Sequence, residues 1–305
     1  MPDVISIGDG IIDAVELENG AVADYPGGAA LNLAVGLARL GLASGLVTRF
    51  GADRRGFLIA RYLREEGVAI LNPPNVVFTG VAFSRRSNGE PFYEFSPEMF
   101  RRRIVFGADV LSAMASARAV TVNSFPFDDH RQSERLVAAL AEVPGLVIVD
   151  PNPRPRLIAD MEAYRQGAER AMAKAALVKL SDEDIALFYD GDLEAAVARL
   201  FDLDIETLLF THGSAGASLR TRSGISLSVD IARQARPLID TMGAGDATLA
   251  TVIAFILRQG MPQDAAIWRL CLTEAMRVAA ETCAHAGGAL RLPEGSLLAM
   301  RRAGL

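Results

Sequence analysis

The sequence predicts an α/β fold around a mostly parallel sheet. Short runs rich in β-branched residues alternate with longer segments of helical periodicity along most of the chain. Half of the 305 residues are hydrophobic and 22% are charged, which suits a large buried core and argues against a disordered chain. Because we find neither an internal repeat nor a Pro/Ser-rich linker, we expect a single domain over residues 1–305.

The expected elements follow one another in the order that parallel βαβ units require. The expected strands are Val4–Ile7, Ser44–Phe50, Ala119–Val122, Leu146–Asp150, Ala176–Leu180 and Thr207–Thr211. The expected helices are Ala29–Leu40, Gly56–Glu66, His130–Glu142, Met161–Ala173, Leu193–Leu203, Ala247–Gln259 and Asp264–His285. Gly41, Gly67 and Gly260 follow three of these helices, where a left-handed cap favours glycine.

Two segments, at about 12–25 and 76–104, interrupt the alternation and predict a small β lid. Val77–Phe83 and Pro91–Phe95 flank an Asn88-Gly89 turn, and Asn-Gly supplies the positive φ angles of a tight hairpin. No helix follows to cover this hairpin, so we expect it to project from the main sheet; an extension of the sheet edge is the alternative. An exposed hairpin edge also favours association, so we expect a homodimer through the lid.

Charge and residue usage exclude several classes of protein. The chain has 31 basic and 37 acidic residues, and its longest basic run is Arg101–Arg103, which argues against a nucleic-acid partner. No apolar run approaches the ~20 residues of a membrane helix and the N-terminus lacks a signal peptide, so we expect a cytoplasmic protein without a membrane partner. Cys271 and Cys283 lie in an apolar helical segment and are expected to be buried free thiols. The three histidines are scattered and form no zinc pattern.

The most informative stretch is Asp240-Thr241-Met242-Gly243-Ala244-Gly245-Asp246, directly before an apolar helix. Gly243 and Gly245 let successive amides turn toward one point, and the start of a helix favours an anion there. Asp246 is expected to stay ionised beside these amides and to accept a proton from a substrate hydroxyl. Capping of the helix is the alternative role for this residue.

Two further glycine turns point to the same end of the sheet. Gly27-Gly28 opens a helix that carries Asn32, which reaches the same cleft if both turns lie at one end of the sheet. Asp13 follows the first strand and lies where open α/β folds bind ligands. The dinucleotide fingerprint lacks its third glycine and no Walker loop is present, which disfavours a nicotinamide-dependent oxidoreductase and Walker-type phosphate binding.

With these turns in place, the chain resembles the ribokinase-like, or phosphofructokinase B, family of carbohydrate kinases. Gly27–Ala34 with Gly41 and Gly51 resembles the family's N-terminal signature, and Asp240–Asp246 resembles its DTxGAGD signature. The resemblance covers about residues 4–293, and the segments 51–56, 79–83, 88–90, 150–154 and 179–181 look closest to the fructokinase-like members. It implies a ribokinase-like three-layer α/β fold with a β lid.

The resemblance also implies an ATP-dependent, fructokinase-like transfer of phosphate to a sugar hydroxyl. Asp246 would be the base, with the amides of Gly243, Ala244 and Gly245 as the anion hole. The implied sugar ligands are Asp13, Gly27, Gly28 and Asn32, and the implied nucleotide ligands are Lys179, Ser181, Thr211, Gly213, Gly216 and Gly288. Asp184 replaces the family's glutamate near Mg²⁺, Glu183 could substitute for it, and Asp240 would lie near a monovalent cation such as K⁺.

Three alternatives remain open at this point. In a 2-keto-3-deoxygluconate kinase, Arg85, Arg86 and Arg101–Arg103 could meet the carboxylate of the sugar acid. In a nucleoside kinase, aromatic residues of the lid such as Tyr93 could stack on a base. A non-catalytic sugar- or nucleotide-binding protein could keep the fold, although the intact Gly-Ala-Gly-Asp motif argues against it.

Overall fold

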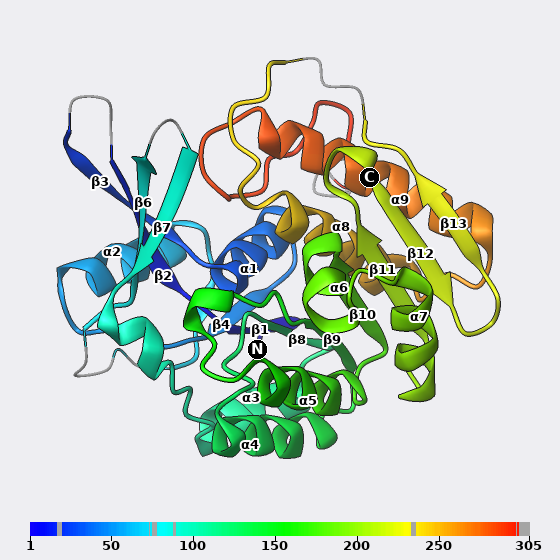
Figure 1. Cartoon of the computed structure of the whole chain (residues 1–305), viewed down its shortest axis with the longest axis horizontal. Helices are drawn as coiled ribbons and strands as arrows, with labels where there is room; N and C mark the ends of the chain where they lie inside the picture. The colour runs from blue at the N-terminus through cyan, green and yellow to red at the C-terminus, as the bar shows by residue number, and fades with distance from the viewer. Residues whose placement is uncertain are drawn as a thin grey trace.

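The computed structural model describes the chain except for residues 17–19, 73, 75–77, 88–89, 233–235, 297 and 299–305, and gives the backbone alone for 84–87 and 90–93. Figure 1 shows a broad sheet between two layers of helices, with a small sheet at one side. The strands are β1 Val4–Gly8, β2 Ile11–Glu16, β3 Val22–Gly27, β4 Ser44–Val47, β5 Ala69–Ile70, β6 Val81–Ser87, β7 Glu90–Phe95, β8 Ala119–Asn123, β9 Leu146–Asp150, β10 Leu177–Ser181, β11 Thr207–Thr211, β12 Ala217–Thr221 and β13 Ser226–Val229. The α-helices are α1 Ala29–Arg39, α2 Arg54–Glu65, α3 Ala108–Ser116, α4 His130–Ala141, α5 Met161–Met172, α6 Asp182–Tyr189, α7 Leu193–Asp202, α8 Ala244–Gln259 and α9 Ala265–Cys283.

The large sheet has the order β13-β12-β11-β10-β9-β8-β1-β4-β5. Its strands are parallel from β11 to β5, while β12 runs antiparallel to both β11 and β13 at the far edge. The carboxyl ends of β1, β8, β9, β10 and β11 therefore meet at one edge, which is where open α/β sheets bind ligands.

Alternation along these strands divides the core between the two faces of the sheet. On one face, residues such as Ile5, Val120 and Val149 pack with α3 to α7. On the other face, Val4 and Ile148 pack with α1, α8 and α9. Successive side chains of a strand point to opposite faces, so every second residue of each central strand lies under α1 and α8. The three-layer arrangement predicted for the chain is confirmed.

The lid is a separate four-stranded sheet in the order β3-β2-β6-β7. β2 pairs in parallel with β6, and β6 pairs antiparallel with β7 from Ala82–Phe95 to Ser87–Glu90. The expected hairpin is therefore confirmed and the edge-extension alternative is wrong, while the Asn88-Gly89 turn itself lies outside the described residues. Arg55 joins the lid to α2, because it donates twice to Asp24 of β3 and lies 5.8 Å from the centre of the Phe83 ring.

Several expected boundaries need correction. The strand expected over Ser44–Phe50 ends at Val47, and the helix expected from Ala247 begins three residues earlier, at Ala244. Helices α3 and α6 and the antiparallel strands β12 and β13 were absent from the expected elements. Gly41, Gly67 and Gly260 do adopt positive φ angles of 85°, 74° and 84° after their helices.

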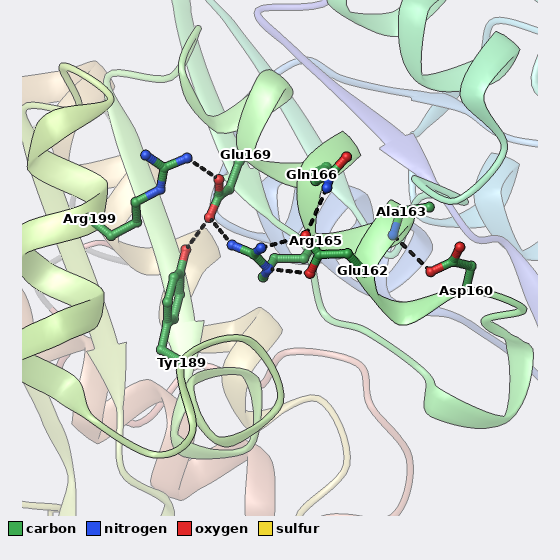
Figure 2. Close-up of polar contacts among 8 residues, drawn as sticks. All are labelled: Asp160, Glu162, Ala163, Arg165, Gln166, Glu169, Tyr189 and Arg199. Atoms are coloured by element: carbon green, nitrogen blue, oxygen red, sulfur yellow. Dashed lines mark hydrogen bonds and ion pairs between the residues drawn. The ribbon is translucent and has the colours of Figure 1, made fainter.

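A buried acid holds three helices together on the α3 to α7 face (Figure 2). Glu169 of α5 accepts hydrogen bonds from Arg165 at 3.1 Å and from Arg199 of α7 at 2.6 Å. Tyr189, at the end of α6, donates to the same carboxylate at 3.4 Å. The cluster therefore stabilises the packing of α5, α6 and α7. Cys271 and Cys283 are buried free thiols as expected, and no described helix has the length and apolar character needed to cross a membrane.

Candidate active site

Helix α8 begins above the carboxyl ends of the parallel strands, and one glycine sets its entry. Gly243 has φ 77°, and a Cβ placed on it would lie 2.1 Å from the carbonyl oxygen of Gly288. The carboxylate of Asp240 fastens the turn, because it accepts the amide of Met242 at 2.9 Å and the amide of Gly287 at 3.1 Å. Glycine at position 243 is thus required both by the left-handed backbone and by the contact with the 287–288 turn.

The remaining residues of the Gly-Ala-Gly-Asp motif lie inside the first turn of α8. Gly245 has a helical backbone and needs no positive φ, which corrects the expectation that both glycines shape the turn. The amide of Ala244 donates to the carbonyl of Thr241 at 3.3 Å. The amides of the first helical turn have no intrahelical acceptor, so those of Gly245 and Asp246 are the donors best placed for an anion.

Asp246 is buried and does not cap the helix. Its carboxylate oxygen Oδ2 accepts a hydrogen bond from Nδ2 of Asn32 at 3.2 Å, across 214 residues of sequence. The cap residue of α8 is Gly243, with no side-chain cap, so the capping alternative does not describe Asp246. Burial raises the pKa of Asp246, whereas Lys179, the Asn32 hydrogen bond and Arg154 each lower it.

Lys179 projects from β10 beneath this helix start. Its Nζ lies 3.3 Å from Oδ1 of Asp150, the last residue of β9, and both side chains are buried. Burial lowers the pKa of Lys179, but the nearby carboxylates of Asp150, Asp184 and Asp246 outweigh it, so the net direction is upward and the amine is charged. Burial raises the pKa of Asp150, and the Lys179 ammonium opposes that rise.

Asp13 faces the cleft from lid strand β2. A Cβ on Gly27 would lie 1.9 Å from its carboxylate, and a Cβ on Gly28, where φ is 99°, would lie 2.6 Å from the carbonyl of Asp9. These two glycines therefore leave room for the acid and for the turn below it. Burial raises the pKa of Asp13 to about 6; Arg154 opposes this, and Asp240 and Asp246 add to it.

The nucleotide candidates lie along the next strand ends. Ser181 and Asp184 form a reciprocal capping box on α6: the Ser181 amide donates to Asp184 at 2.6 Å, and the Asp184 amide donates to the Ser181 hydroxyl at 3.2 Å. Thr211 ends β11, and Gly213 and Gly216, with φ angles of 51° and 98°, bound the turn that follows it. Ser181 pairs with Thr211 at the ends of the neighbouring strands β10 and β11, and Lys179 lies two residues before Ser181. All three residues therefore lie near the same edge of the sheet.

Carboxylates at the start of α6 suit Mg²⁺ by their chemistry, because Mg²⁺ takes oxygen ligands and usually uses one or two carboxylates together with substrate phosphates. Asp184 is buried with one oxygen committed to the capping box, and Glu183 is exposed. Among the described residues there is no group of three or more His, Cys, Asp or Glu side chains arranged to hold a metal ion. A metal here would therefore need the nucleotide's phosphates as further ligands.

Comparison with known proteins decides the family. The model of the pfkB family of carbohydrate kinases matches residues 1–294. The chain belongs to this family. A fructokinase of Klebsiella pneumoniae is 32% identical over 276 residues, covering 85% of this chain and 86% of that protein. The ribokinase-like resemblance inferred from the motifs is thereby confirmed, and the protein is a carbohydrate kinase.

Solved structures of fructokinases share the fold. A fructokinase of Xylella fastidiosa with bound ATP has a TM-score of 0.83 at 22% identity, over 99% of this chain and all of that one. A fructokinase double mutant of Vibrio cholerae, bound to fructose, ADP and potassium ion, has a TM-score of 0.76 at 23% identity, over 98% of each chain.

Two charged groups of the cleft were missing from the residues selected on sequence. Both Asp150 and Arg154 lie in a segment that resembles fructokinases. Asp150 contacts Lys179, and the positive charge of Arg154 lowers the pKa of both Asp13 and Asp246. Asp150 could have been selected from the sequence, because it is an acid at the end of a buried parallel strand, where ligands bind in open α/β sheets. Within Arg101–Arg103, Arg102 forms a 2.7 Å ion pair with Asp9. One of the arginines expected to meet the carboxylate of a sugar acid is therefore already paired with an acid of the protein.

Proposed function

We propose that this carbohydrate kinase is an ATP-dependent fructokinase. The observation that carries the proposal is the hydrogen bond between Asn32 and Asp246, which joins the helix after the first glycine turn, α1, to the helix after the second, α8. Asp13 faces the same space from the lid, so a sugar hydroxyl held there would lie between a carboxylate, an amide side chain and the free amides of α8. Similarity to fructokinases over most of the chain supports the ketose as substrate.

In the proposed reaction, Asp246 takes the proton of the sugar hydroxyl as that oxygen bonds to the γ-phosphorus of ATP. The bond from the γ-phosphorus to the bridging oxygen breaks at the same time, and ADP leaves. The amides at the start of α8 and the Lys179 ammonium stabilise the charge on the transferred group. Asp13, Gly27, Gly28 and Asn32 orient the sugar, and the lid above them excludes water.

On the nucleotide side, we propose that Lys179, Ser181, Thr211, Gly213, Gly216 and Gly288 surround ATP. Asp184 or Glu183 would hold Mg²⁺, which supplies charge neutralisation on the phosphates. By its resemblance to the family's motif, Asp240 would lie beside a monovalent cation such as K⁺. Its carboxylate joins the 240–246 turn to the 287–288 turn. We also propose a homodimer through the lid: β3 is an edge strand, and its Val22 and Tyr25 side chains are 56% and 51% exposed.

The test is ADP release with MgATP and a panel of fructose, ribose, 2-keto-3-deoxygluconate, tagatose phosphate and nucleosides. We expect turnover with fructose, and a loss of about 100-fold or more in kcat for Asp246→Asn. Asp160→Asn is the control, because Asp160 is an exposed cap of α5 and Asn can also cap. Preference for another acceptor, or an Asp246→Asn variant as active as the control, would contradict the proposal.

A further inference from the structure

A ladder of three polar side chains lies beneath the start of α8. Asn123, Asp150 and Lys179 come from the neighbouring strands β8, β9 and β10. Asn123 pairs in register with Asp150, and Val178 pairs with Val149, so Lys179 and Asp150 occupy the next positions of their strands. By alternation all three side chains lie on the sheet face that α1 and α8 cover.

Lys179 has more donors than partners. Its side chain is only 6% exposed, and an ammonium carries three N–H donors. Within the described part of the chain, Asp150 is the single residue that accepts a hydrogen bond from it. A Cβ on Gly245 would lie 3.4 Å from Nζ, so the ammonium lies against the first turn of α8. Its remaining donors are thus available at the place where an anion is favoured.

An ammonium is not expected at this place without a fixed counter-charge, because the start of a helix carries positive potential. Asp150 supplies that charge from a rigid position. It is fully buried, its carboxylate also accepts a 3.5 Å hydrogen bond from Asn123, and its carbonyl accepts the amide of Ser124. The geometry points to a positioning role for Asp150 within the proposed kinase reaction: it holds the Lys179 ammonium at the start of α8, where Lys179 contacts the transferred phosphoryl group and favours ionised Asp246.

Charges from several elements face Asp246, and they allow this role to be measured. Lys179 comes from β10, Asp150 from β9, Arg154 from the segment after β9 and Asp13 from the lid. Lys179 and Arg154 lower the pKa of Asp246, whereas the Asp246 carboxylate raises the pKa of Asp150 and of Asp13. Removing the charge of Lys179 should therefore raise the pKa of Asp246. Removing Asp150 has two opposing effects on that pKa, since it takes away a neighbouring carboxylate and also frees the Lys179 ammonium, so the role of Asp150 is measured by kcat instead.

The experiment compares the pH dependence of kcat in the wild type, Lys179→Met, Asp150→Asn and the double variant, with saturating MgATP and the sugar that the wild type phosphorylates. We expect the acid limb to move up by about one pH unit in Lys179→Met. In Asp150→Asn we expect kcat to fall about 100-fold with little change in KM for the sugar. If Asp150 acts through Lys179, the double variant should have the same kcat as Lys179→Met.

The control is Glu169→Gln, which also breaks a buried acid's contacts with basic side chains but lies in the α5 to α7 cluster (Figure 2). It should lower the melting temperature and leave the acid limb in place. If Asp150→Asn fails to fold, the double variant decides, since replacing both partners of a buried ion pair leaves no unpaired charge. An unchanged acid limb in Lys179→Met, an Asp150→Asn variant with the kcat of the wild type, or a double variant with lower kcat than Lys179→Met overturns the inference. A wild type inactive on every sugar refutes the proposed function instead.

Discussion

Replacing Asp13 by asparagine should stabilise the protein while impairing catalysis. The pKa of Asp13 rises from 3.8 to about 6, chiefly through burial, so ionising this acid is costlier in the folded than in the unfolded chain. The folded state binds more protons at this site between these two values, so the contribution of Asp13 to stability is lost as pH rises from about 4 to about 6. Above pH 6 the full cost is present.

The size of this cost follows from the shift. A rise from 3.8 to about 6 corresponds to at most about 3 kcal/mol, and the partial solvent exposure of Asp13 brings this to about 1–3 kcal/mol. For a chain of this length each kcal/mol is worth about 2–4 °C in melting temperature. We therefore expect Asp13→Asn to melt several degrees above the wild type at pH 8, and that gain to shrink toward pH 4.

The assay is thermal unfolding of both proteins from pH 4 to pH 8, with kcat/KM for the sugar measured at pH 8. Loss of a hydrogen bond to a charged group should cost about 10- to 100-fold in kcat/KM. Asp53→Asn is the matched control, and it should lower the melting temperature. Asp53 accepts the Gly56 amide and both the amide and hydroxyl of Thr79, and an amide side chain cannot accept all three. A gain for Asp13→Asn that is equal at pH 4 and pH 8, or no gain at pH 8, would refute the reasoning.

Two further predictions concern the glycines of the motif and the lid. Gly243→Ala should cost several degrees of melting temperature and most activity, because its Cβ would lie 2.1 Å from the carbonyl oxygen of Gly288. Gly245→Ala should fold normally, because its Cβ would lie 3.4 Å from Nζ and 3.8 Å from Cε of Lys179, which are ordinary contact distances; equal melting temperatures would contradict this. The proposed homodimer should dissociate when Val22 and Tyr25 are both replaced by lysine, as measured by light scattering. Leu111→Lys, at an exposed site on α3, is the control, and a monomeric wild type would refute the proposed dimer.

The sequence was most informative where local chemistry and long-range order agree. Alternating strands and helices, the Asn-Gly hairpin and the glycine caps each have a local cause, and each of these elements is present apart from the hairpin turn, which lies outside the described residues. Strands β12 and β13 were missed because they mix polar and apolar residues at the edge of the sheet, without the apolar runs of its centre. Helix α6 was missed although Ser181 and Asp184 have the spacing of a capping box, since that motif usually has glutamate or glutamine, not aspartate, at its N3 position.

Within the site, glycine-rich turns could be located from sequence but their conformations could not. Gly243 and Gly245 look equivalent in the motif, yet only Gly243 is left-handed, because the helix has already begun at Ala244. The partnership of Lys179 with Asp150 depends on the register of two parallel strands, which no local pattern specifies. Pairing across the sheet is therefore what turns two ordinary strand residues into a charged pair under the helix.

The electrostatics of the cleft explain why such a pair is retained despite its cost. Burial raises the pKa of Asp13, Asp150 and Asp246 together, so the folded chain holds three acids in an environment that disfavours their ionised forms. Hydrophobic residues of similar size would relieve that strain, as they do for many buried ion pairs. In the proposed reaction Asp246 must remain ionised to accept a proton, and the cation that lowers its pKa, Lys179, is itself buried next to Asp150, which supplies the counter-charge. Stability is thus lower at the sheet edge because a base and an anion site have to be kept side by side.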